Sequence, residues 1–156
     1  MELAVPGPTH PPVVASWATS PQESRRWCSL DRVASEDVTR WGAEPDVRAY
    51  VALVDGEPVG YGELWLDDDE AEVELARLIV APARRGQGLG RRMVTLLTTL
   101  AREHHPAVLM RLHPDNTQAL RCYTAAGFDL VPPDQADEWN QCQPVSYVWL
   151  RHRSDH

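Results

Sequence analysis

The spacing of apolar residues predicts one long amphipathic helix between two strands in the middle of the chain. Apolar side chains recur every three or four residues from position 89 to position 100, which is the period of a helix with one buried face. They are Leu89, Met93, Leu96, Leu97 and Leu100. The segments 72–80 and 107–113 are rich in β-forming residues and predict a strand on each side of this helix.

Turn and capping signals divide the rest of the chain into shorter elements. Asp55-Gly56 is typical of a hairpin turn, and Ser20, Pro21 and Glu23 are typical of a capped helix start. The further elements predicted are helices over 21–28, 35–41 and 116–126, and strands over 48–54, 59–66, 128–131 and 145–150. We expect an acidic turn at 67–70 and a long loop over 132–144.

These elements predict a single α/β (α+β) domain with a mixed sheet flanked by helices. Hairpin strands come first and a strand–helix–strand unit follows, so the sheet should be antiparallel at the front and parallel further on. A chain of 156 residues, 43% of them hydrophobic, can form one sizeable core. We assign residues 13–150 to this domain, 1–12 to an extended proline-rich lead-in and 151–156 to a frayed tail.

The charge balance argues against a protein that binds nucleic acid. Twenty-three acidic residues outnumber 15 basic ones, all of them arginine, and the net charge is -8. The three cysteines, Cys28, Cys122 and Cys142, form no CxxC pair, so we expect reduced thiols. The sequence has no metal-ligand motif, no signal peptide pattern and no apolar stretch long enough to cross a membrane. We therefore expect a soluble cytoplasmic protein that binds no metal.

A glycine-rich loop between the strand 72–80 and the long helix is the clearest candidate for a binding site. Its sequence, from position 84 to position 92, is Arg-Arg-Gly-Gln-Gly-Leu-Gly-Arg-Arg. Glycines let the backbone approach a ligand closely, and the free amides of the helix start favour an anion. Arg91 and Arg92 lie in the first helical turn, where the helix dipole disfavours cations unless an anion is bound. The loop therefore predicts a phosphate or pyrophosphate site; it matches neither a Walker A loop nor the GxGxxG fingerprint.

Two segments resemble signatures of the GNAT superfamily of acyl-CoA-dependent N-acetyltransferases. Residues 85–90 match its (Gln/Arg)-x-x-Gly-x-(Gly/Ala) signature, and residues 78–82 look like the strand ending in front of it. Residues 116–128 are similar to its Asn-x-x-Ala-x-x-x-Tyr-x-x-x-Gly-Phe segment. The resemblance covers about residues 48–150, with both segments in the expected order.

The resemblance implies that the strands 72–80 and 107–113 are parallel but splay apart, and that acetyl-CoA enters between them. The pantetheine arm would bond to backbone groups of the first strand, and the pyrophosphate would lie on amides of the loop. The cofactor residues implied in this way are Leu78, Ile79, Val80, Arg85, Gly86, Gln87, Gly88, Leu89, Gly90, Arg91, Asn116 and Tyr123.

Tyr123 matches the family position that hydrogen-bonds to the thioester sulfur. Because a phenol is a weaker acid than a thiol, we expect a hydrogen bond that strengthens as the thiolate forms rather than full proton transfer. The alternative is a ring that only packs on the sheet. Asn116 has two readings, as a cofactor contact or as the cap of the helix that follows it, and the two are compatible.

The general base is expected among carboxylates on the strand 72–80. Glu72 and Glu74 alternate onto one face, and the family often has a carboxylate there. We favour Glu74 because it lies deeper along the strand, whereas Glu72 is closer to the acidic turn. Such a base would act through water or with a pKa raised by burial. His113 is a further candidate, and solvated carboxylates are the alternative.

The acceptor is expected to be an amine that carries apolar bulk, most simply a small molecule. The resemblance implies that the N-terminal helices and the loop 132–144 form its walls, with Trp17, Trp27, Trp41, Trp139, Asp134, Asp137 and Glu138. The alternative is that the tryptophans are ordinary core residues. A protein N-terminal acetyltransferase of the ribosomal-protein type is the alternative enzyme. A non-catalytic acyl-CoA sensor is the alternative from another class. An edge strand near the C-terminus would allow a homodimer.

Overall fold

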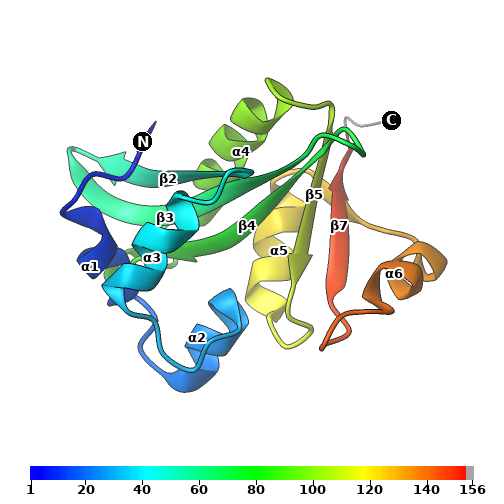
Figure 1. The fold of residues 1–156 in the computed structure, drawn as a ribbon, viewed down its shortest axis with the longest axis horizontal. Helices are drawn as coiled ribbons and strands as arrows, with labels where there is room; N and C mark the ends of the chain where they lie inside the picture. Colours follow the sequence, from blue (N-terminus) through cyan, green and yellow to red (C-terminus); the bar gives the residue numbers. More distant parts are fainter. Residues whose placement is uncertain (154–156) are drawn as a thin grey trace.

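The computed structural model describes residues 1–153 and shows one seven-stranded mixed sheet with helices on both faces. The strand order is β1-β2-β3-β4-β5-β7-β6. In Figure 1 the strands β2, β3 and β4 run across the molecule, while β5 and β7 stand at a steep angle to them. The sheet therefore has two halves that meet at β4 and β5.

The first half is an antiparallel meander. Its strands are β1 (Glu2–Ala4), β2 (Val47–Val54), β3 (Glu57–Asp67) and β4 (Glu72–Val80). Asp55 and Gly56 join β2 to β3 with φ values of 51° and 81°, as a two-residue hairpin turn requires. The pairing of β3 with β4 is interrupted opposite Gly62, where Arg77 has a φ of 49°. This irregularity is a β-bulge in the strand that borders the second half.

A short parallel contact joins the two halves. β4 pairs with β5 (Ala107–Leu112) at four register positions, from Glu72 opposite Ala107 to Leu75 opposite Met110. The two strands diverge beyond this point (Figure 1). β7 (Val148–His152) and β6 (Phe128–Leu130) complete the second half in antiparallel pairing.

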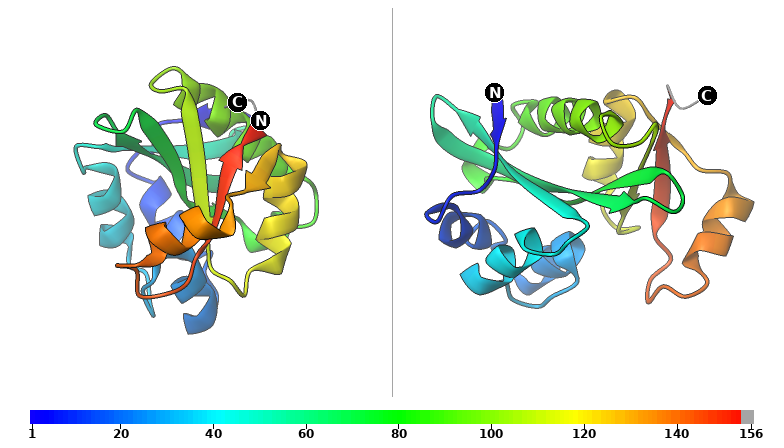
Figure 2. Two further views of the ribbon diagram at one scale, coloured as in Figure 1. Left: turned by 90° about the vertical axis from the view of Figure 1, so that its right-hand side faces the viewer. Right: turned by 45° about the horizontal axis from the view of Figure 1, so that its top comes forward.

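Helices cover the two faces of the sheet with separate cores. α4 (Leu89–Arg102) and α5 (Thr117–Ala125) lie on one face, where Met93, Val94 and Leu97 pack on the sheet. The opposite face carries α1 (His10–Ala15), α2 (Pro21–Cys28) and α3 (Ser35–Gly42), as the right-hand view of Figure 2 shows. A single 3-10 turn, η1 (Pro82–Arg84), leads from β4 into the glycine-rich loop.

The structure corrects three expectations about the chain ends and the loop. Residues 1–12 are not simply extended: they contain β1 and the first turn of α1. The segment 132–144 is not a continuous loop: it contains α6 (Pro133–Asn140). Proline is tolerated in the first turn of both helices because the amides there have no intrahelical acceptor. β7 spans 148–152 instead of 145–150, because the Asn140 side chain bonds both backbone groups of Tyr147.

The mixed α/β fold with a splayed parallel pair is confirmed. The predicted core helix begins at Leu89, and of its predicted apolar face Leu89, Met93 and Leu97 are buried, while Leu96 and Leu100 are half-buried. Arg151 and His152 belong to β7 rather than to a frayed tail, while residues 154–156 of that tail lie outside the described residues.

Candidate active site

The divergence of β4 and β5 opens a hollow of about 750 Å³, which we call the cofactor cleft. Its walls come from the ends of β4 and β5, the glycine-rich loop, the start of α4, and parts of α2 and α5. Leu78, Val80 and Met110 give it an apolar floor, and several arginines surround its loop end. The cleft is therefore apolar at its centre and cationic at one end.

The loop end of the cleft has the geometry of an anion site. Gly86 and Gly88 have φ values of 78° and 76°, and no atom lies within 4 Å of where a Cβ would be. Gly88 is the N-cap of α4 and has no side chain to accept hydrogen bonds from the first-turn amides. Those amides are available to a phosphate, in agreement with the interpretation of the loop from the sequence.

Nearly all residues predicted to bind the cofactor line this one cleft. They are Leu78, Ile79, Val80, Arg85, Gly86, Gly88, Leu89, Gly90, Arg91, Asn116 and Tyr123. Gln87 is the member of the predicted set that does not, and its amide oxygen accepts a hydrogen bond from Arg84 at 3.2 Å. The fold therefore brings together residues that are up to 45 positions apart in the sequence.

Arg85 connects the glycine-rich loop to the helix α2. Its guanidinium lies 2.5 Å from a carboxylate oxygen of Glu23, and its Nε donates to the carbonyl of Val80. Burial alone would raise the pKa of Glu23, but the hydrogen bond and charge of Arg85 outweigh it and the net shift is downward. The pair holds α2 against the cleft.

Tyr123 and Asn116 lie on the side of the cleft formed by α5. Burial raises the pKa of Tyr123, so its phenol stays protonated and has a proton to donate in a hydrogen bond. Among residues 1–153, none forms a hydrogen bond with this hydroxyl. The Asn116 side chain accepts from the amide of Ala119 at 3.2 Å, which establishes its capping role, and Asn116 also lines the cleft.

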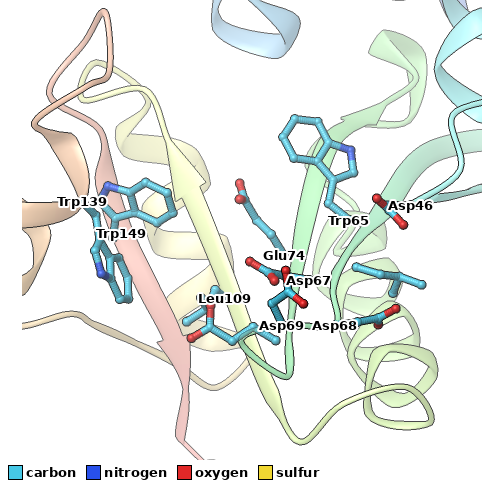
Figure 3. Close-up of a pocket in the computed structure, with 11 residues that line it drawn as sticks. Asp46, Trp65, Asp67, Asp68, Asp69, Glu74, Leu109, Trp139 and Trp149 are labelled. Atoms are coloured by element: carbon cyan, nitrogen blue, oxygen red, sulfur yellow. The ribbon is translucent and has the colours of Figure 1, made fainter.

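A second hollow of about 750 Å³, the acidic hollow, lies beside the first half of β4. Figure 3 shows Trp139 and Trp149 on one side of it, Trp65 and Asp46 on the other, and Glu74 between them. The remaining lining residues are Leu66, Asp67, Asp68, Asp69, Glu72 and Leu109. Carboxylates and indole rings together make a site suited to organic cations.

Both predicted base candidates line the acidic hollow, and both lie near an arginine. Arg111 holds Glu74 with two hydrogen bonds, Nε to Oε2 at 2.7 Å and Nη2 to Oε1 at 2.9 Å. An Arg151 nitrogen is 3.6 Å from the Glu72 carboxylate, and burial raises the pKa of Glu72 despite that charge. His113 follows β5, lines neither hollow and lies 3.5 Å from Asp115.

The sequence analysis missed a buried carboxylate on β3. Glu63 is 0% exposed and accepts hydrogen bonds from Tyr61, Trp65 and Arg77 at 2.5, 2.8 and 2.9 Å. Burial raises its pKa, although these donors act in the opposite direction. The signal that was available is the alternation of Tyr61, Glu63 and Trp65, which places all three on one face of the strand.

Contacts of both the side chain and the backbone carbonyl of Arg77 hold the bulge in place. Its guanidinium bonds to Glu63 and lies 4.4 Å from the centre of the Trp41 ring. Its carbonyl accepts a hydrogen bond from Trp27 of α2 at 2.8 Å. The position of α2, a wall of the cofactor cleft, is therefore linked to the point where β4 turns away from β5.

The expected acceptor walls are only partly present. Trp27 lines the cofactor cleft and Trp139 the acidic hollow, whereas Trp17 and Trp41 are 6% and 3% exposed and belong to the core. The acidic residues of the segment 132–144 line neither hollow. The acidic character comes instead from the turn 67–69 and from β4, as well as Asp46.

The profile of the Acetyltransferase (GNAT) family matches residues 13–128. The chain belongs to this family. The family assignment confirms the resemblance found in the sequence, and the matched range contains both the glycine-rich loop and Tyr123.

The GNAT chain is similar to curated acetyltransferases with different acceptors. It is 29% identical to an aminoglycoside N(6')-acetyltransferase type 1 of Klebsiella pneumoniae, in a match covering 56% of this chain and 50% of the relative. It is 30% identical to the peptidyl-lysine N-acetyltransferase YjaB of Salmonella typhimurium, over 65% of this chain and 63% of the relative. The chain thus spans about half the length of the first of these relatives.

Solved GNAT structures share the fold at lower identity. The aminoglycoside acetyltransferase AAC(6')-Ib with ribostamycin and coenzyme A has a TM-score of 0.76 and 21% identity, over 98% of this chain and 93% of that one. The spermidine N-acetyltransferase of Vibrio cholerae with CoA and spermine has a TM-score of 0.73 and 12% identity, over 96% and 92%.

Residues 1–153 contain no helix long and apolar enough to cross a membrane. The same residues contain no group of three or more metal-ligating side chains.

Proposed function

We propose that this GNAT protein transfers the acetyl group of acetyl-CoA to a primary amine of a small polycationic molecule, by direct attack within a ternary complex. One observation carries the proposal: the cofactor cleft and the acidic, tryptophan-lined hollow lie on adjoining parts of β4 and β5. Leu75 and Met110 line the first, while Glu74 and Leu109 line the second.

The residues of the cleft suit the cofactor part of the reaction. The amides at Gly86 to Gly90 would hold the pyrophosphate, and the apolar wall at Leu78 and Val80 would accept the pantetheine arm. The amine attacks the thioester carbonyl, the C–S bond breaks, and CoA leaves as a thiolate. The protonated hydroxyl of Tyr123 would hydrogen-bond to that thiolate as its charge develops.

The amine must lose a proton, and we propose that Glu74 or Glu72 accepts it, directly or through water. Burial raises the pKa of Glu72 and makes it a stronger base than an ordinary carboxylate. Glu74 lies closer to the divergence of the strands, but both of its oxygens are held by Arg111. Glu74 can therefore act only when this ion pair changes.

A polycationic acceptor fits the charge of the hollow. Six of its 11 lining residues are acidic, and the chain carries a net charge of -8. Two structural relatives are described with polycations in their complexes, ribostamycin in one and spermine in the other. The curated peptidyl-lysine acetyltransferase relative makes a peptide amine the main competing acceptor.

A screen for CoA release tests the proposal. The purified protein is given acetyl-CoA with aminoglycosides, polyamines, simple monoamines, lysine-containing peptides and peptides with free N-termini, and free thiol is measured. We expect turnover with the polycations at a kcat/KM at least about tenfold above that of a monoamine of similar size, because several charges contact the hollow.

Other outcomes of the same screen contradict specific parts of the proposal. Turnover confined to peptides would move the acceptor class to protein amines. Binding of CoA without turnover on any amine would leave an acyl-CoA sensor. Failure of acetyl-CoA to bind, measured by calorimetry, would remove the cofactor assignment itself.

A further inference from the structure

Arg111 lies inside a ring of aromatic side chains that resembles a binding site for an organic cation. Its Cζ atom is 4.7 Å from the centre of the Trp149 ring, 5.4 Å from that of Tyr147 and 5.8 Å from that of Trp65. Glu74 closes the ring with its two hydrogen bonds. We call Trp65, Tyr147, Trp149 and Glu74 the cation cage.

The cage and the arginine inside it lie between the two hollows. Trp65, Trp149 and Glu74 line the acidic hollow, whereas Arg111 itself lines the cofactor cleft. The guanidinium that fills the cage therefore separates the place where a cationic acceptor would enter from the place where the thioester would lie. The volume of the cofactor cleft lies on the other side of this guanidinium.

We propose that the cation cage is the subsite for a cationic group of the acceptor, and that Arg111 occupies it when no acceptor is bound. The acceptor's ammonium or guanidinium would replace Arg111 between the aromatic rings and against Glu74, as Arg111 turns into the cleft. One cation replaces another, so the cage keeps its neutral ion pair and its cation–π contacts throughout. The inference rests on the proposed function, and it names Arg111 as a specificity-determining residue.

A comparison with Arg77 shows why we assign this exchange to Arg111. Arg77 is also flanked by tryptophans and paired with a carboxylate, but its partner Glu63 is 0% exposed and accepts two further hydrogen bonds. Glu63 lines neither hollow. Glu74 has a 15% exposed side chain, lines the acidic hollow and, within residues 1–153, accepts hydrogen bonds from Arg111 alone. An entering cation can reach Glu74 and cannot reach Glu63.

The exchange also accounts for the position of Glu74. While Arg111 is bound, hydrogen bonds from its guanidinium occupy both carboxylate oxygens of Glu74. Replacement of Arg111 by the acceptor's own ammonium brings the acidic proton to the carboxylate that could accept it. The acceptor would thus create the arrangement in which Glu74 can function.

Binding of tetramethylammonium tests the cage without any turnover. This cation cannot be acetylated or donate an N–H hydrogen bond, and tert-butanol is a neutral control of similar shape. Arg111→Met keeps a long apolar side chain and removes the positive charge from the cage, while the Glu74 carboxylate stays. We expect calorimetry to show at least about tenfold tighter tetramethylammonium binding to this variant than to the wild type, with no gain for tert-butanol.

Two further variants keep the test decisive. Arg111→Met combined with Glu74→Gln should lose the gain, because the carboxylate is part of the cage. Arg111→Lys keeps a cation on β5, but a lysine cannot form the bidentate pair of hydrogen bonds with Glu74. The affinity of this variant for tetramethylammonium should therefore lie between those of the wild type and Arg111→Met. If Arg111→Met does not fold, the comparison of Arg111→Lys with the wild type decides.

Equal tetramethylammonium affinity in folded wild type, Arg111→Lys and Arg111→Met would overturn the inference. So would an equal gain for tert-butanol, which would indicate an apolar cavity rather than a cation site. Because these measurements contain no acetyl-CoA, they stand if the acetyl-transfer screen fails. Turnover of polycations without any effect of Arg111 on cation binding would remove the cage alone and leave the proposed function intact.

Discussion

The phenol of Tyr123 is kept protonated by its surroundings, and this limits what it can do. Burial raises its pKa above the ordinary value, so proton transfer to a thiolate is more unfavourable than for a free phenol. A donor hydrogen bond to the developing thiolate remains open to it, since it lines the cleft and has no partner among the described residues.

Tyr123→Phe should lower kcat by about tenfold to a thousandfold, the range for the loss of a single transition-state donor. The KM for acetyl-CoA should change much less, because the hydroxyl acts mainly as charge develops on sulfur. Steady-state kinetics with the best amine from the screen provide the measurement. An unchanged kcat, with chemistry shown to be rate-limiting, would exclude Tyr123 from the reaction.

The same residue predicts a loss of stability in alkali. An acid whose pKa is raised on folding keeps its proton in the folded state, while the unfolded chain releases it. The unfolding free energy therefore falls as pH rises above about 10, by up to about 1.4 kcal/mol per pH unit for each such phenol. Tyr61, whose pKa is also raised by burial, contributes in the same direction.

Tyr123→Phe should reduce the slope of this alkaline fall, measured by urea unfolding between about pH 9 and pH 11. Tyr61→Phe should do so too, but it also removes a hydrogen-bond donor from Glu63 and lowers stability at every pH. An identical slope in the wild type and in both variants would show that these phenols ionise normally in the folded protein.

Sequence reasoning at the residue level reaches furthest where chemistry is local. The residue types of the glycine-rich loop indicate an anion site by themselves, whereas the donor role expected of Tyr123 comes from the resemblance to the GNAT family. Glu63 and Arg111 were missed because their roles depend on partners 14 and 37 positions away. Their side-chain environment exists only once β3, β4 and β5 are aligned in register.

At the level of elements, the turn into α4 depends on glycine for two separate reasons. Gly88 has a φ of 76°, which disfavours a residue with a Cβ, and the space beside it is open. A side chain there would add backbone strain and would occupy the position proposed for the pyrophosphate.

Gly88→Val should abolish CoA binding and lower the unfolding free energy by about 1–2 kcal/mol. Gly56→Val is a matched control, since Gly56 has a φ of 81°, equally open surroundings and a position in the β2–β3 turn away from the cleft. It should have a similar effect on stability and leave the dissociation constant of CoA unchanged. Calorimetry and thermal unfolding of both variants separate strain from ligand contact, and normal CoA binding by Gly88→Val would disprove the loop assignment.

Besides the strand β1, the elements not predicted from the sequence are short helices with a proline in their first turn. α1 and α6 begin at His10 and Pro133, in segments where clustered prolines and polar residues indicated loops. α1 is stabilised by packing, because Val14 is fully buried in the core between the sheet and the N-terminal helices. α6 is held by contacts of Trp139 and Asn140 with Trp149, which local sequence does not reveal.

The whole molecule carries a charge that should guide a cationic acceptor. The net charge of the chain is -8 and carboxylates line the acidic hollow, so both attract a cationic acceptor. Salt shortens the range of this attraction from about 30 Å at 0.01 M to about 10 Å at 0.1 M.

We therefore expect kcat/KM for a triamine to fall several-fold over this range of salt, and kcat/KM for a monoamine to fall much less. Initial rates at constant pH provide the measurement, with the KM for acetyl-CoA recorded in parallel. A triamine whose kcat/KM does not depend on salt would show that the acidic hollow does not bind it.

The four-position contact between β4 and β5 has a consequence for folding kinetics. β2, β3 and β4 are joined by short turns, whereas β5 reaches β4 only after α4 has crossed the sheet. Such non-local pairing is slow to form, so we expect β4 and β5 to pair late in folding.

The cofactor cleft lies where these two strands meet, so its ligand should not yet be bound in the folding transition state. Saturating acetyl-CoA should then slow unfolding and leave the refolding rate unchanged, as stopped-flow fluorescence can measure. The supply of cofactor would set how long each folded molecule survives, and not how quickly it forms.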